Sequence, residues 1–212
     1  AIFLTPAFSC PAFTHERESG TMYMLLSSIM TPNQIIIGKW VVAFRVPAAL
    51  VALPGVFLAI LFPLFGVGGD FFDRLVTVIG YAAVIGATIA FLTSLGLAAS
   101  LFFRTTLGAM LASYSFVLVV FALPALAAKI VSVYLQASDK TALMIQTTSP
   151  FAAIYTIGER YRVETIRGAM STSSIDIPFH TWGWYLAGCL ALTVLCLAAV
   201  RWSFHRLSKL IA

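Results

Sequence analysis

The sequence predicts an all-α integral membrane protein, a polytopic helical bundle with four complete spans and the end of a fifth. Hydrophobic residues make up 60% of the chain and charged residues only 10%, whereas a soluble domain carries about 25% charged residues. Four stretches contain no Asp, Glu, Lys or Arg: 46–69, 75–103, 105–128 and 177–200. Each is at least as long as the ~20 residues that an α-helix needs to cross a bilayer.

Helices fit these stretches better than the strands of a β-barrel. Barrel strands would show segments of about ten residues with alternating polarity, but runs such as Phe116–Ala128 are continuously apolar. In hydrocarbon, each segment must satisfy its own backbone polar groups, which favours helices. The formal charge of +5 is attributed to basic cytoplasmic ends, because no Lys/Arg run is long enough for a nucleic-acid patch. We therefore expect one transmembrane domain over residues 1–212.

The N-terminal part predicts a span end, a surface segment and a helix start. Residues 1–13 are apolar but too short to span, and they lack the basic start of a secretory signal. We expect them to be the end of a span whose beginning is missing, so that the chain is a fragment. Residues 14–26 are amphipathic and should lie along the membrane surface. Thr31, Pro32 and Gln34 form a helix-start signal with a capping box.

Further spans are expected at about 75–103, 107–128 and 182–202, with a tight turn at Arg104-Thr105-Thr106. Small residues recur in the second of the four spans, and such residues allow helices to approach closely: Gly80, Gly86, Ala90, Gly96 and Ser100. Residues 129–176 should form a loop outside the cytoplasm that contains short interfacial helices, one of them starting at Ser149-Pro150.

Cationic and Trp side chains near the span ends are predicted to anchor the bundle at the membrane interface. Lys and Arg extend to the headgroups, and Trp prefers that level. The anchors are Lys39, Trp40, Arg45, Arg104, Trp182, Trp184, Arg201 and Trp202. Seven of the 13 Lys and Arg lie in segment 14–45, at Arg104 and at the C-terminus. Their position close to the spans places these ends in the cytoplasm by the positive-inside rule.

No catalytic or metal site is predicted. His15, His180 and His205 are isolated in different segments, and the three cysteines lie in apolar segments as small hydrophobic residues. The chain contains no Gly-x-x-x-x-Gly-Lys-Ser/Thr phosphate loop. We therefore expect a protein that is not an enzyme, binds no cofactor and cannot hydrolyse ATP by itself.

The segment between residues 16 and 39 resembles the cytoplasmic segment of type-2 ABC (ATP-binding cassette) transporter permeases. The resemblance rests on residues that keep the order of that pattern: Glu16-Arg17-Glu18-Ser19-Gly20-Thr21, Leu25-Leu26, Pro32, Ile35-Ile36 and Gly38-Lys39. The turn at Ser100–Thr106 and the element Ser149-Pro150-Phe151 are also similar to that family. The residues Ser27-Ser28-Ile29-Met30 depart from the family's usual sequence near the proline.

The resemblance implies a permease subunit in a cell membrane, the bacterial inner membrane, that exports a substrate. Permeases of this family have six spans, so the first span and most of the second would be missing here. Residues 14–30 would be a cytoplasmic coupling segment whose amphipathic coupling helix docks on a separate ATPase, which binds ATP and Mg. A second permease subunit, identical or different, would complete the transporter. The implied coupling residues are Glu16, Arg17, Glu18, Gly20, Thr21, Leu25 and Leu26.

Three other functions compete with this interpretation. An ion-coupled transporter or channel normally needs ionisable groups inside the membrane, and the four charge-free stretches have none. An intramembrane enzyme needs a nucleophile and base or a metal site, and no such His/Asp/Glu constellation is present at membrane depth. A membrane assembly subunit without transport activity is compatible with the sequence. The substrate cannot be derived from the sequence.

Overall fold

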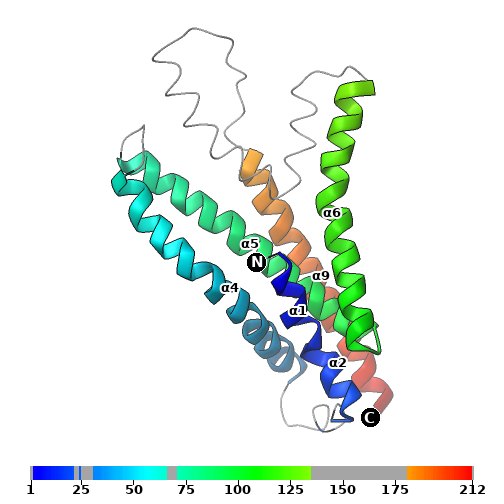
Figure 1. Ribbon diagram of the computed structural model, residues 1–212. Helices are drawn as coiled ribbons and strands as arrows, with labels where there is room; N and C mark the ends of the chain where they lie inside the picture. Colours follow the sequence, from blue (N-terminus) through cyan, green and yellow to red (C-terminus); the bar gives the residue numbers. More distant parts are fainter. Residues whose placement is uncertain (1, 22–23, 25–30, 66–70, 135–180, 212) are drawn as a thin grey trace. The chain divides into compact units, whose positions relative to one another are not determined.

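The computed structural model describes residues 2–21, 24, 31–65, 71–134 and 181–211. The elements of this part are all α-helices (Figure 1): α1 Leu4–Ser9, α2 Pro11–Glu18, α4 Pro32–Phe65, α5 Phe71–Phe102, α6 Thr106–Tyr134 and α9 Thr181–Ile211. The predicted all-α fold is confirmed for these residues. The predicted helix start at Ser149-Pro150, the Leu25-Leu26 pair and most of the 129–176 loop lie outside them.

Three helical segments are long and apolar enough to cross a membrane: Pro32–Leu61, Arg74–Phe102 and Gly183–Phe204. A shorter apolar segment, Thr106–Phe121, belongs to α6. Many large apolar side chains on these helices are exposed, as expected where the surrounding medium is lipid. The total of four complete spans and the end of a fifth stays a prediction.

The predicted start of the first long helix is confirmed. α4 begins at Pro32, and the N–H of Thr31 donates to the side-chain Oε1 of Gln34 over 3.0 Å. This is the reciprocal half of a capping box, which satisfies a backbone donor that the helix leaves without a partner. The predicted turn after the second long helix is also present, because α5 ends at Phe102 and α6 begins at Thr106.

Two helices continue further than the sequence predicted. α6 extends to Tyr134, although the span was expected to end near residue 128, and α9 extends to Ile211, beyond the expected end at Trp202. In both cases the expected end was placed at a charged residue, Lys129 or Arg201. A charge ends the apolar surface of a helix, but it leaves the backbone hydrogen bonds intact, so the helix itself can continue.

The chain divides into two compact units. Unit 1 comprises Ala1–Val51, Thr88–Val117 and Cys189–Ala212, and unit 2 comprises Ala52–Ala87 and Leu118–Gly188. In unit 2, side chains such as Leu53, Phe57 and Ile79 are largely exposed. The residues of the candidate coupling segment all belong to unit 1.

The core of unit 1 is an apolar cluster contributed by α2, α4, α5 and α9. Its buried members are Phe13, Ile35, Ile36, Leu97, Leu101, Val200 and Phe204. The rings of Phe13 and Phe204 lie 5.9 Å apart, centroid to centroid, at an angle of 49°. Beside the cluster, Trp40 Nε1 donates to Ser94 Oγ over 2.9 Å, which joins α4 to α5. The first turn of α2 is thus packed against the longer helices.

Candidate functional site

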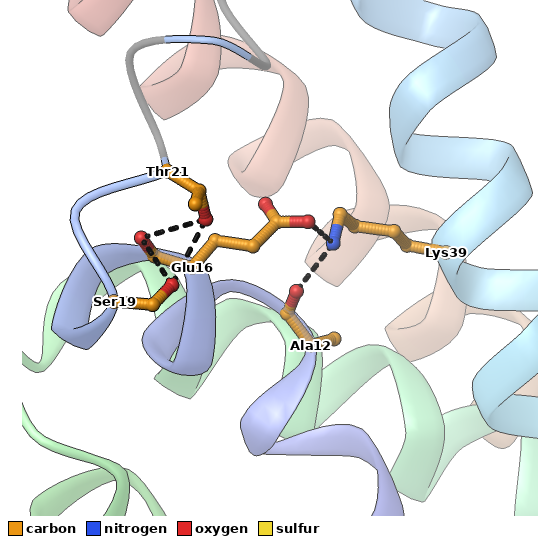
Figure 2. A network of polar contacts seen from close by, with 5 residues as sticks. All are labelled: Ala12, Glu16, Ser19, Thr21 and Lys39. Atoms are coloured by element: carbon orange, nitrogen blue, oxygen red, sulfur yellow. Dashed lines mark hydrogen bonds and ion pairs between the residues drawn. The ribbon is translucent and has the colours of Figure 1, made fainter.

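The charged triplet, residues 16–18, occupies the last turn of α2. The helix stops at Glu18, where the N–H of Ser19 donates to the carbonyl of His15 over 2.9 Å. Gly20 then has a φ of +74°, a left-handed conformation that favours glycine. The chain therefore leaves α2 through a bend at Gly20. The hydroxyls of Ser19 and Thr21 lie 2.9 Å apart in this turn (Figure 2).

Glu16 joins α2 to α4 through an ion pair. Lys39 Nζ donates to Glu16 Oε1 over 2.6 Å and to the carbonyl of Ala12 over 2.5 Å (Figure 2). The ammonium also lies 4.9 Å from the centroid of the Phe13 ring, a cation–π distance. The side chain of Glu16 is only 25% exposed and that of Lys39 only 19%. Removal of either partner would leave the other charge poorly solvated and without its counter-ion.

Arg17 joins α2 to the C-terminal end of α5. Its two terminal nitrogens donate to the carbonyls of Phe103 and Leu101, over 2.9 and 3.2 Å. The last carbonyls of a helix have no partner within the helix. They also carry the negative end of the helix dipole, which favours a cation. Arg17 therefore caps α5 with a guanidinium that belongs to another helix.

Glu18 joins α2 to the N-terminal end of α6. Its Oε1 accepts a hydrogen bond from the N–H of Thr106 over 2.7 Å. This bond lowers the pKa of Glu18 below its ordinary value of 4.5, because it favours the charged carboxylate. The hydroxyl of Thr106 also donates to Thr14 Oγ1 on α2 over 3.0 Å. An anion thus lies where the positive end of the α6 dipole favours one.

The structure therefore brings together three of the predicted coupling residues and one predicted anchor. Glu16, Arg17 and Glu18 all contact other helices of the same chain, and Lys39 is the ion-pair partner of Glu16. Sequence reasoning had assigned Lys39 to the membrane interface and missed this pair. Opposite charges in neighbouring polar segments could have suggested it. Gly20 and Thr21 are exposed in the turn after α2, and Leu25 and Leu26 lie outside the described residues.

The other predicted anchors lie apart from the triplet. Trp40 is partly buried against Ser94 and stacks on Phe44 at a centroid distance of 5.2 Å. The side chains that remain exposed, as an interfacial anchor requires, are those of Arg45, Arg104, Trp184, Arg201 and Trp202. The backbone of Trp182 belongs to α9, and its side chain lies outside the description. The anchoring role of all these residues stays a prediction.

Within the part of the chain that the structure describes, no three His, Cys, Asp or Glu side chains gather as metal ligands would. The cysteines described there, Cys10, Cys189 and Cys196, are all free thiols. The contacts that the structure shows at residues 16–18 are hydrogen bonds and one ion pair.

Acid should weaken the link between α2 and α6. Because the folded pKa of Glu18 is lowered, its contribution to stability is present above about pH 4.5 and is lost as the pH falls through the folded pKa. We expect Glu18→Ala to lower the melting temperature of the detergent-solubilised protein at pH 7, and the gap to wild type to narrow below pH 4.5. A gap that stays constant down to pH 3 would contradict this assignment.

Comparison with protein families agrees with the resemblance described above. A model of the ABC-2 family, described as ABC-2 family transporter protein, matches residues 3–208. The chain belongs to the ABC-2 family. The predicted type-2 ABC permease is confirmed at this level, as is its character as an integral membrane protein. No curated protein and no solved structure matches the chain significantly.

Membership of the ABC-2 family also sets the context of the triplet. An ABC-2 permease is a membrane subunit, and the ATPase of the transporter is a separate subunit. The contacts of the triplet therefore lie in the membrane subunit.

Proposed function

We propose that this ABC-2 permease couples ATP hydrolysis by a separate ATPase subunit to the export of a substrate across the bacterial inner membrane. In this proposal the segment 14–30 is the cytoplasmic coupling segment, and it docks on the ATPase. A second permease subunit, identical or different, completes the pathway. The loop 129–176 lies on the opposite side of the membrane.

One observation carries the proposal: α2 ends in a charged turn that is bonded to the ends of three long helices. Its triplet contacts Lys39 on α4, the last carbonyls of α5 and the first N–H of α6. A partner that pushes on this turn would displace several helices together. The chain lacks a phosphate loop of its own, so the energy would have to come from the partner.

The exposed turn after α2 offers the docking surface for the ATPase. Ser19, Gly20 and Thr21 are all exposed there. We expect the permease to retain its ATPase subunit when the two are co-expressed and purified. Ser19→Arg should lower the recovered ATPase about tenfold, because a bulky charge in the centre of an interface prevents close packing.

Asn33→Arg is the matched control. It adds the same side chain at another exposed position, on the first turn of α4, and should leave the recovered ATPase unchanged. A wild-type permease that retains no ATPase would show that the proposed function is wrong. Equal loss in both variants would show that the docking surface is not confined to the turn after α2.

A further inference from the structure

We propose that residues 16–18 form an internal clamp that transmits the movement of the coupling segment, and that they are not the surface on which the ATPase docks. This inference rests on the proposed function and deepens it. It follows from the direction in which the three side chains point. Each directs polar atoms to another helix of its own chain: Glu16 to Lys39, Arg17 to Leu101 and Phe103, and Glu18 to Thr106.

The signs of the charges match the helix ends that they contact. Arg17 is a cation at the C-terminal end of α5, and Glu18 is an anion at the N-terminal end of α6. These are the ends at which the helix dipole favours each sign. Adjacent residues of α2 therefore hold both sides of the turn that connects α5 to α6. If α2 separated from this turn, the end carbonyls of α5 and an end N–H of α6 would lose their partners together.

The Glu16–Lys39 pair adds α4 to the clamp. Lys39 also donates to the carbonyl of Ala12 and lies over the ring of Phe13, so one ammonium has three contacts on α2. Phe13 in turn is fully buried in the apolar cluster of unit 1. Polar bonds and apolar packing thus fasten the same two turns of α2. We infer that α2 and the neighbouring ends of α4, α5 and α6 move as one body.

The two possible roles of Glu18, in the clamp or in a docking surface, require different properties of its side chain. As part of the clamp, Glu18 needs an oxygen that accepts the N–H of Thr106, and a glutamine carbonyl provides one. As a docking residue it would need its negative charge, which glutamine lacks. Glu18→Gln keeps the acceptor and loses the charge, so it should retain part of the clamp. Glu18→Ala loses both and should resemble a broken clamp.

Arg17 has a matched control in Arg104. Arg104 is an exposed cation on the turn between α5 and α6 and has no hydrogen bond or ion pair with other described residues. Arg17→Gln and Arg104→Gln remove the same charge from the same end of unit 1. Only the first removes a cap from α5, so only the first should weaken the clamp.

The test uses the purified complex of permease and ATPase, with two measurements on each variant. One is the amount of ATPase retained, and the other is the rate of ATP hydrolysis that the permease adds to that of the ATPase alone. We expect Glu18→Ala and Arg17→Gln to lower the added rate about fivefold or more, the scale on which loss of a helix cap shifts an equilibrium, while the retained ATPase is unchanged. Glu18→Gln should give an added rate between those of wild type and Glu18→Ala, and Arg104→Gln should match the wild-type rate. Both variants should retain as much ATPase as wild type.

A third measurement tests the clamp without the ATPase. Backbone amide exchange of the peptide covering residues 103–109, in the permease alone, should be faster in Glu18→Ala than in wild type or Glu18→Gln, because Thr106 loses its acceptor. Unchanged exchange in Glu18→Ala would overturn the clamp, whether or not an ATPase binds.

The outcomes separate the clamp from the function on which it rests. If Glu18→Gln and Glu18→Ala both release the ATPase, the triplet docks through its charge, so the clamp is wrong and the proposed function stands. If the wild-type permease retains no ATPase, the proposed function and the transmission role both fail, and the exchange measurement still decides whether the contacts hold α2 in place.

Discussion

Replacing Phe13 with alanine is expected to destabilise the protein by about 3–5 kcal/mol, the range for large aromatic side chains removed from a packed core. Phe13 is fully buried, and its ring contacts a cluster contributed by four helices. Lys39 also lies over this ring at 4.9 Å. The substitution therefore removes apolar packing and a cation–π contact at the position where α2 meets the long helices. The loss can be measured as the shift in denaturant-induced unfolding in mixed micelles.

The matched control for this prediction is Phe57→Ala on α4. Phe57 is 66% exposed, so its ring is surrounded mainly by lipid or detergent, and its removal should cost less than about 1 kcal/mol, as for ordinary surface substitutions. Equal losses in the two variants would contradict the position of Phe13 in the core. A cycle with Phe204→Ala should also give a coupling of about 0.5–1.5 kcal/mol, as for tilted ring pairs.

The parts of the fold that follow from local chemistry could be predicted from the sequence. The start of α4 follows from Thr31, Pro32 and Gln34, whose capping bond is present in the structure. The turn between α5 and α6 follows from the one charge that interrupts two long apolar stretches, Arg104. Hydropathy predicts where the long helices lie, but it predicts their ends less accurately, as at α6 and α9. A charged residue ends the apolar surface of a helix but leaves its backbone hydrogen bonds intact.

The contacts of the charged triplet could not be predicted, for a physical reason. Arg17 bonds to residues 84 and 86 positions further along the chain, and its acceptors are backbone carbonyls. Every residue has a carbonyl, so the sequence carries no sign of which one is the acceptor. Glu18 likewise bonds to a backbone N–H, 88 positions away. The sequence marks these residues as charged and surface-adjacent, and only the fold shows that each bonds to another helix or helix end of its own chain.

The small residues of α5 show a similar limit, which leads to a second prediction. Gly86 and Gly96 are indistinguishable in the sequence pattern, and both could allow a close helix approach. In the structure, a Cβ added at Gly86 would meet nothing within 4 Å. A Cβ at Gly96 would lie 1.8 Å from the Oγ and 2.7 Å from the Cβ of Ser9, on α1. Gly96 is therefore the position at which the chain needs a residue without a side chain.

Gly96→Ala is expected to destabilise the protein by about 1–3 kcal/mol or more, as overpacking does in a tight core. Ser9 cannot avoid the new methyl group by rotating, because its Cβ is itself too close. The N-terminal helix would have to move away from α5. Gly86→Ala in the same helix is the control, and it should be neutral or stabilising by up to about 1 kcal/mol, since alanine is the better helix former.

A second-site substitution makes this prediction specific. Ser9→Gly removes the two atoms that would clash with the new methyl group and leaves only an ordinary contact with Cys10 N at 3.5 Å. Ser9→Gly with Gly96→Ala should therefore be considerably more stable than Gly96→Ala with Ser9 present. The two changes act on one contact, and they should therefore be strongly non-additive in a double-mutant cycle, with a coupling of about 1–3 kcal/mol. Additive effects would show that Ser9 and Gly96 are not in contact. α1 leads directly into α2 at Cys10. A strong coupling would therefore also show that α1, and with it the start of α2, packs against α5.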